Sequence, residues 1–454
     1  SLDACTTGAN NTSVGHDALG ATTTGNSNTA VGEDCLQANT TASNNTAVGR
    51  RAMFSNTTGT DNVAMGHNAL DANTTANNNT AIGHDALTEN TTGAQNTAIG
   101  SLALDANTTA GNNTAVGYST LSANNTGTSN VAMGSFALLS NTTGDENTAL
   151  GQNSLDANTT ANANTAVGFN ALTENTTGAN NTGVGRTALS SSTTGSSNTA
   201  LGKDALATNT TADNNTAVGR SALVSNSTGA NNTAVGMNAL DANTSADNNT
   251  AVGKSALTEN TTGTRNTSVG ALCMDANTTA NDNTAVGYDA MGQNTTGEKN
   301  TALGTYAFDA NTTGSSNVAV GRAALSANTT ADHNTAIGFQ AMDVNTTGAQ
   351  NTAVGSGALD ACTTADANTA VGYLAATALT TGAQNTAIGM AAAEVLTEGS
   401  DNIVIGHDAA DNLTTGGQNI AIGVDTSLSA ADGANQIVMG QNVTCVGNSN
   451  FTFG

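Results

Sequence analysis

Two histidines of this chain have a spacing that could bring them to one metal ion. His67 and His84 are seventeen residues apart, and Asp85 directly follows the second of them. Imidazole nitrogens and carboxylate oxygens are ordinary zinc ligands, but a site needs several of them converging in a pocket. The sequence indicates neither a third convergent ligand nor a pocket. We therefore interpret these residues as surface histidines and predict no metal site.

Carboxylates recur along the chain, but their spacing does not suit acid–base catalysis. If each seventeen residues form one coil, many of these residues lie roughly 10 Å apart, too far for a shared general-acid pair. The chain also lacks the GxxxxGK[ST] phosphate loop and the Gly-Gly-x-Gly-x-Asp calcium repeat. We predict no catalytic and no cofactor-binding residues, and a protein that is not an enzyme. The carboxylates concerned are Asp71, Asp105, Asp156, Asp241 and Asp275.

Aromatic side chains and thiols add no stronger candidates for chemistry. Five aromatic residues could stack on sugars but are separated by long stretches of chain, so we interpret them as incidental surface groups. They are Tyr118, Phe169, Tyr288, Phe339 and Tyr373. The five cysteines are too scattered for a disulfide framework or a metal site, and we expect buried free thiols. They are Cys5, Cys35, Cys273, Cys362 and Cys445.

A strict internal repeat sets the positions of all these residues. The pentapeptide Asn-Thr-Ala-Val-Gly begins at Asn11 and recurs with variations every seventeen residues to Asn419. Its glycine runs from Gly15 to Gly440 without insertion or deletion, which gives twenty-six copies. Counted from the asparagine as position one, the consensus is N-T-A-V-G-x-x-A-L-x-x-N-T-T-G/A-x-x. This period predicts an all-β parallel β-solenoid of about 26 coils, each with two short extended runs, stacked about 4.8 Å apart.

Substitutions along each column of the repeat suggest which positions face inward. Position four is always apolar, position two alternates between Thr and Val or Ile, and position nine is mostly Leu. We predict that these three columns form the core. Position twelve is usually Asn but becomes Cys5, Cys362 or Leu379, so we predict an interior ladder of stacked amides. Such asparagines could not carry a glycan after folding, although the Asn-Thr-Thr triplets match the acceptor motif.

Positions three and five are almost always Ala and Gly, and we expect them to point outward as a smooth uncharged strip. An exposed strip of this kind invites association, and small residues would let backbones approach closely. We therefore predict a homotrimer in which three chains meet along positions three and five. The repeat weakens near the end, so residues 1–426 form the regular solenoid and residues 427–454 a terminating segment. The chain begins in mid-coil, from which we expect more protein upstream.

Composition excludes several classes of protein. Aromatic residues make up 2% of the chain, and Pro and Trp are absent, so only a thin core repeated many times can form. A formal net charge of -25 disfavours nucleic acid and anionic membrane surfaces as partners. No run of eighteen apolar residues is present, so we expect no membrane insertion.

The runs NTAVGYDAM, NTAIGFQAM and NTAVGRSAL resemble two groups of repeat proteins. One is the head of trimeric autotransporter adhesins, a left-handed parallel β-roll trimer. The other is the repeat region of phage and marine bacterial tail-fibre proteins, which also carries the ALxxNTTG segment. The final segment, NQIVMGQNVTCVGNSNFTFG, resembles the sequence that precedes the self-cleaving chaperone domain of many tail fibres. The resemblance implies a left-handed trimer, proteolytic maturation at or beyond Gly454, and an extracellular place on a virion or cell surface.

This resemblance predicts a structural tail fibre that attaches to a host or surface receptor, a glycan by expectation, through a distal region. A cell-surface adhesin head or stalk is the alternative. An ice-binding solenoid is a further one, because position thirteen supplies a column of threonines, including Thr40, Thr57, Thr74 and Thr91. A polysaccharide-degrading fibre enzyme would need a carboxylate cluster in a groove, which regular coils do not favour.

Overall fold

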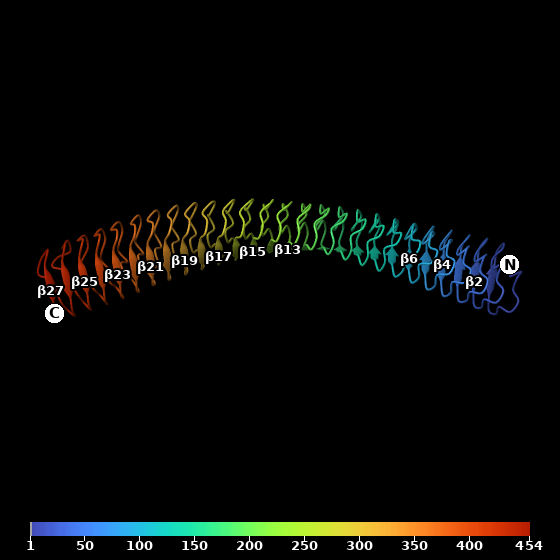
Figure 1. Cartoon of the computed structure of the whole chain (residues 1–454), viewed down its shortest axis with the longest axis horizontal. Coiled ribbons are helices and arrows are strands. Elements are labelled where there is room, and N and C mark those ends of the chain that lie inside the picture. Colours follow the sequence, from blue (N-terminus) through green and yellow to red (C-terminus); the bar gives the residue numbers. More distant parts are fainter. Residues whose placement is uncertain (1) are drawn as a thin grey trace. The chain divides into compact units, whose positions relative to one another are not determined.

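The computed structural model describes residues 2–454, which form two compact units, residues 2–230 and residues 231–454. Both units are parallel β-solenoids, and together they contain about 26 coils of seventeen residues. Within each unit the coils follow one another with a single three-residue strand per coil (Figure 1). The described residues contain no helix, and thus no helix that could cross a membrane.

In the first unit, thirteen strands pair in parallel and in register, each residue with the one seventeen further on, as Thr12 pairs with Thr29. These strands are β1 (Thr12–Val14), β2 (Thr29–Val31), β3 (Thr46–Val48), β4 (Val63–Met65), β5 (Thr80–Ile82), β6 (Thr97–Ile99), β7 (Thr114–Val116), β8 (Val131–Met133), β9 (Thr148–Leu150), β10 (Thr165–Val167), β11 (Thr182–Val184), β12 (Thr199–Leu201) and β13 (Thr216–Val218).

The second unit repeats this arrangement, and its last coil is shorter, because Ile437 pairs with Phe451 only fourteen residues later. Its strands are β14 (Thr233–Val235), β15 (Thr250–Val252), β16 (Thr267–Val269), β17 (Thr284–Val286), β18 (Thr301–Leu303), β19 (Val318–Val320), β20 (Thr335–Ile337), β21 (Thr352–Val354), β22 (Thr369–Val371), β23 (Thr386–Ile388), β24 (Ile403–Ile405), β25 (Ile420–Ile422), β26 (Ile437–Met439) and β27 (Phe451–Phe453).

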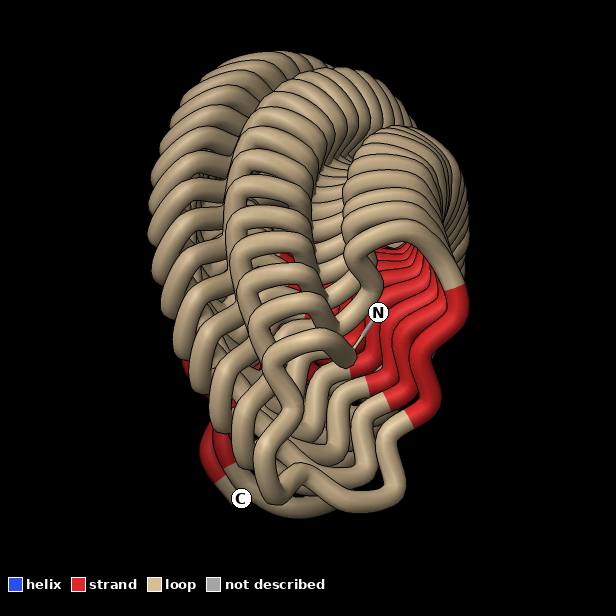
Figure 2. The backbone as a smooth tube through the Cα atoms, turned by 90° about the vertical axis from the view of Figure 1, so that its right-hand side faces the viewer, coloured by secondary structure: helices blue, strands red, loops and turns tan. Residues whose placement is uncertain are grey.

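The prediction of two extended runs per coil is wrong for the second run. Figure 2 shows one strand per coil in red and the rest of the coil as loop. Positions seven and nine adopt left-handed backbone conformations, as at Asp17 (φ 51°) and Leu19 (φ 53°), which no extended strand allows. The main chain still bonds from coil to coil, because the N–H of Leu19 donates to the carbonyl of Cys35. From Leu19 to Ala410 position nine is never Val or Ile, since β-branched residues resist this conformation.

The strand faces opposite to the sequence-based prediction. Position three is buried almost throughout, as at Ala30, Ala132 and Ala149, so it lies inside and not on an outward strip. Positions two and four, expected in the core, lie on the outer face. Side chains alternate along a strand, so one error of direction exchanges both faces. The interior has little room here, because a Cβ on Gly183 would lie 3.3 Å from the Leu172 side chain, and only Val404 and Val438, in two late coils, place a larger aliphatic group at this position.

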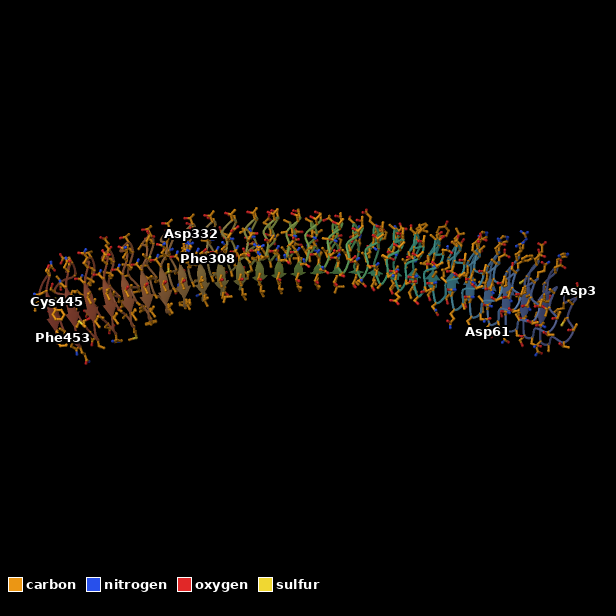
Figure 3. All side chains as sticks on the ribbon, viewed as in Figure 1. Asp3, Asp61, Phe308, Asp332, Cys445 and Phe453 are labelled. Atoms are coloured by element: carbon orange, nitrogen blue, oxygen red, sulfur yellow. The ribbon has the colours of Figure 1, made fainter. Side chains whose placement is uncertain are left out.

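The interior itself is a thin layer of small, aliphatic and amide side chains. Positions one, three, eight, nine, twelve and fifteen are buried, so the prediction for position nine is confirmed. Phe308, at position nine, is the largest fully buried side chain (Figure 3). In three late coils Ala takes position nine and Leu takes position twelve, and both stay buried, as Ala376 and Leu379 do. The leucine thus moves from position nine to position twelve, so each of these coils still has one leucine in its core.

Two ladders of asparagine run through the interior. The predicted ladder at position twelve is present: the Asn141 amide donates to Asn124 Oδ1 at 2.9 Å and accepts from Asn158 Nδ2 at 2.8 Å. The ladder at position one was not predicted. There the Asn130 side chain donates to the Gly144 carbonyl at 2.8 Å and accepts from the Asn147 main-chain N–H at 2.9 Å. Each amide thus joins adjacent coils and satisfies buried backbone groups.

Glycine at position five turns the chain out of the strand. Its φ lies between 124° and 145° from Gly15 to Gly440, a conformation that L side chains rarely adopt. A Cβ on Gly151 would also collide with the carbonyl oxygen of Gly168 in the next coil. Both constraints explain why this column tolerates no other residue.

Candidate functional site

The strand positions that point outward form a continuous uncharged face of Thr and aliphatic side chains on each unit. Position four holds only Val, Ile, Leu or Met, and position two only Thr, Val or Ile, so no charge interrupts the face. Several of these side chains are well exposed, including Met65 at 47%, Met133 at 48% and Ile337 at 39%. A regular, uncharged sheet face of this length on an acidic chain is typical of an interaction surface. We call positions two and four the aliphatic face.

Charges of opposite sign border the two edges of the aliphatic face. Position six lies just beyond its glycine turn and carries six of the nine basic residues: Arg50, Arg186, Lys203, Arg220, Lys254 and Arg322. Positions sixteen and seventeen lie just before the strand and are acidic in many coils: Asp61, Asp145, Glu146, Asp213, Asp247, Asp282, Glu298, Asp332, Asp366 and Asp401. Where they are charged, position six is thus mainly basic, with Glu33 as an exception, and positions sixteen and seventeen are mainly acidic, with Arg265 and Lys299 as exceptions. We call these two borders the basic edge and the acidic edge.

The predicted surface aromatics lie at position six, and all five are exposed. Two of them have aromatic partners that the sequence analysis missed, because the partner sits at position seven of the next coil. Tyr118 meets Phe136 edge to face with ring centres 5.4 Å apart, and Tyr288 meets Tyr306 at 5.6 Å. Such pairs stabilise neighbouring coils, which is a structural role.

Acidic grooves lie on the side of each unit, between positions seven, ten and eleven and the threonines of position thirteen. One groove of about 740 Å³ is lined by Asp85, Glu89 and Asp105, and one of about 480 Å³ by Asp275, Asp289 and Gly292. Carboxylates thus gather in grooves, contrary to the expectation that regular coils keep them apart. Gly292 provides the room, because a Cβ there would collide with Asp289 and lie 3.3 Å from Asp309.

The second groove should make the stability of its unit depend on pH. Burial, with the nearby charges of Asp289 and Asp275, raises the pKa of Asp309 from 3.8 to about 6. The folded state then holds this proton more tightly than the unfolded state does, so stability is highest below about pH 4 and falls as the pH rises through 6. We expect Asp309→Asn to flatten this dependence in thermal unfolding scans, and Asp332→Asn, at an exposed position sixteen, to leave it unchanged. Equal profiles for wild type and Asp309→Asn would contradict the assignment.

Thiol chemistry has no support among the described residues. All five cysteines are free; Cys35, Cys273, Cys362 and Cys445 are buried, as predicted, and Cys5 is half-buried. Burial raises the pKa of Cys35 to about 12 and of Cys273 and Cys362 to about 11, so these thiols stay protonated at neutral pH.

The threonine column at position thirteen is held by the main chain. The hydroxyl of Thr40 donates to the Thr57 carbonyl, and that of Thr57 to the Thr74 carbonyl, at 3.2 and 3.0 Å. These hydroxyls donate their hydrogen bonds to the next coil. They are therefore less available to bind ice as an outward-facing array.

Four of the five histidines lie at position six, and the fifth, His333, lies at position seventeen. His16, His84 and His407 each lie within 3.4 Å of the aspartate that follows them. His67 and His84 stack on each other in adjacent coils, with ring centres 5.2 Å apart.

A comparison with models of known protein families found none that matches this chain, and a comparison with curated proteins found no match either.

Proposed function

We propose that this chain is the shaft of an extracellular fibre, a structural protein that assembles into a parallel homotrimer and carries a separate attachment region. The observation that supports this function best is the aliphatic face of each unit, since no strand from Thr12 to Met439 carries a charged residue at positions two and four. A chain with a net charge of -25 repels its copies overall, and this repulsion is weakest along an uncharged face.

The extent of the face is adequate for a stable interface. A three-residue strand is roughly 10 Å wide and each coil adds about 4.8 Å, so each coil offers roughly 50 Å². The thirteen strands of the first unit then offer roughly 600 Å² per chain. A pair of chains would bury about 1,200 Å² there, the lower limit of specific interfaces, before the second unit is added.

The charged edges favour parallel association. In a parallel arrangement the basic edge of one chain meets the acidic edge of its neighbour, whereas an antiparallel pair brings edges of like charge together. Opposite charges across an interface select the orientation of the partners more than they add affinity. Three chains, as in the proteins that the repeat resembles, would close the face around one axis.

The interface proposed here replaces the one predicted from the sequence. Positions three and five cannot join the chains, because position three is buried within each coil. Positions two and four take over that role. We propose the trimer from the aliphatic face together with the resemblance of the repeats. The virion or cell-surface location and the glycan receptor rest on the resemblance.

The mass of the assembly in solution tests the proposal. We expect sedimentation equilibrium to give three times the chain mass of 44.3 kDa, independent of concentration in the micromolar range. A monomer or an antiparallel dimer would contradict it. Labels placed near Thr12 and near Met439 separate the two orientations, because only a parallel assembly brings identical labels together.

A shaft that only holds its attachment region at a fixed distance should tolerate the loss of whole coils. Deleting residues 147–180 removes two complete repeats and rejoins Glu146 to Asn181, which restores the sequence register. We expect folding to be retained, the assembly to shorten by about 10 Å in small-angle scattering, and target choice to stay the same. Deleting residues 147–171 instead breaks the register and should unfold the adjacent coils. A change of target after the in-register deletion would place recognition on the coils.

One observation favours ice binding as a second candidate. Threonines at position two and aliphatic side chains at position four form two regular ranks on a flat sheet, which position thirteen alone does not provide. Thermal hysteresis in the wild-type protein that is lost when Thr148 and Leu150 are replaced by Lys would support this function. Its absence would remove it.

A further inference from the structure

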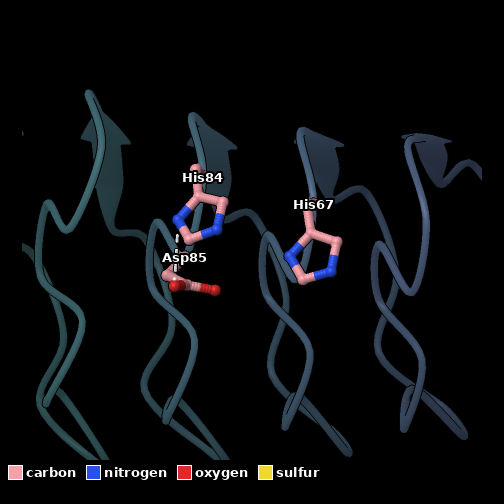
Figure 4. Close-up of side chains that lie close together, drawn as sticks. All are labelled: His67, His84 and Asp85. Atoms are coloured by element: carbon pink, nitrogen blue, oxygen red, sulfur yellow. Dashed lines mark ion pairs between the residues drawn. The ribbon is translucent and has the colours of Figure 1, made fainter.

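The coils that carry β4 and β5 bring two histidines and one aspartate together on the surface of the first unit (Figure 4). The rings of His67 and His84 are nearly parallel, at an interplanar angle of 11°. Asp85 Oδ2 lies 3.0 Å from His84 Nδ1. One possible ligand atom from each of the three residues lies within 4.8 Å of the other two.

The main chain and a neighbouring amide fix this arrangement. The N–H of Asp85 donates to the carbonyl of His67 at 3.0 Å, so the two coils are joined next to the cluster. Asn68 Nδ2 donates to Asp85 Oδ1 at 3.0 Å. The amide thereby orients the carboxylate and leaves Oδ2 directed at the histidines. Hydrogen bonds of this kind to a ligating carboxylate tune metal sites.

His67 supplies the second, independent sign of a ligand. Its Nδ1 is shielded from solvent and has no hydrogen-bond partner. A shielded polar atom without a partner is unfavourable, and native structures contain few of them. A cation bound in the plane of the ring at this nitrogen would satisfy an atom that the protein leaves unpaired.

We propose that His67, His84 and Asp85 form a binding site for a divalent transition metal of the Zn²⁺ class. Two imidazoles and one carboxylate suit such an ion, and they leave a position for water or an external ligand. Ligand atoms around tetrahedral zinc lie roughly 3.3 Å apart, so these partly exposed rings would turn out of their stacked arrangement to bring their nitrogens to one ion. Asp85 also lines the groove of about 740 Å³, so the open position would be reached from there.

Two other clusters in the chain provide natural comparisons. His16, Asp17 and Asp34 meet the same distance limit, and so do His407, Asp408 and Asp425, but each has one histidine and two carboxylates. Oxygen-rich sets favour hard cations over zinc. The metal at the proposed site would join adjacent coils and stabilise them by its binding free energy.

Titration of the metal-free full-length chain with Zn²⁺, by calorimetry and by thermal unfolding, tests the site. We expect one saturable site whose affinity falls at least about tenfold in His67→Gln and in His84→Ser, since each loses a ligand. Both replacements occur naturally in this column, at Gln152 and Ser101, so folding should be retained, as circular dichroism can verify. The controls His16→Ser and His407→Ser should bind as the wild type does. No saturable binding, or wild-type affinity in His67→Gln and His84→Ser, would overturn the proposal.

A transplanted site gives a test that does not depend on loss of function. Met390 occupies position six in the coil before His407 and Asp408, and Ala391 occupies the place of Asn68. The double variant Met390→His, Ala391→Asn recreates the arrangement in the second unit. We expect the stoichiometry to rise from one zinc per chain to two, with a matching rise in the d–d absorption of bound Co²⁺. An unchanged stoichiometry would show that this geometry does not bind the metal.

Discussion

Replacing Val116, Met133 and Leu150 with Glu should separate the chains and leave each of them folded. These residues occupy position four in three consecutive coils, on the aliphatic face. In a single chain the new carboxylates reach solvent, so we expect a loss of stability of about 1 kcal/mol or less per site. In the proposed trimer nine carboxylates would face one another in a dry interface, which costs several kcal/mol in total. Sedimentation should therefore give the mass of one chain.

The matched control lies one residue earlier in each strand. Ala115, Ala132 and Ala149 are fully buried at position three. Replacing them with Glu forces charges into an interior without partners, and we expect the coils around β8 to unfold, at a cost of more than about 4 kcal/mol. Circular dichroism should show lost β-structure for this variant alone. If the Ala115, Ala132 and Ala149 variant stays folded, the strand direction is wrong. If the outward variant keeps the wild-type mass, the aliphatic face does not join the chains.

Asn130→Ala should be among the most destabilising single truncations in the chain. Its side-chain amide bonds the Gly144 carbonyl and accepts the N–H of Asn147, and both partners are buried. Alanine leaves these backbone groups unsatisfied, which costs about 2–4 kcal/mol in that region. Long repeat arrays do not unfold in two states, so the loss is best measured by hydrogen exchange of the amides near β8 and β9. Protection equal to wild type would contradict the role of the ladder.

A single and a double variant at position twelve can separate the effect of the amide bonds from that of core volume. Asn141→Leu removes the bonds to Asn124 and Asn158 and places a second large side chain beside Leu138. The double variant Leu138→Ala, Asn141→Leu copies the exchange seen at Ala376 and Leu379, so it should recover part of the stability that the single variant loses. If the double variant is the less stable of the two, core volume does not explain the exchange.

The sequence by itself determined the solenoid and its register. A seventeen-residue period without insertion permits only stacked coils whose columns coincide, and columns that accept Asn, Cys and Leu alike had to be internal. This reasoning located position nine and the amide ladder at position twelve correctly, because burial limits which residues can replace one another there. The same register puts four of the five histidines and the five predicted surface aromatics in one column at position six.

Only the tertiary structure decided which way each strand faces. Alternation of side chains along Thr-Ala-Val has two solutions, and hydrophobicity favours placing Val inside, whereas the narrow coil takes Ala there in most repeats and Val only at Val404 and Val438. The left-handed residues at positions seven and nine turn the chain around this interior, and no periodicity reports them. The geometry of the proposed zinc site depends on those turns as well, because they bring Asn68 and Asp85 beside the stacked rings of His67 and His84. Spacing along the chain specifies which coils are adjacent, but the direction of each side chain follows from the backbone conformation that packing selects.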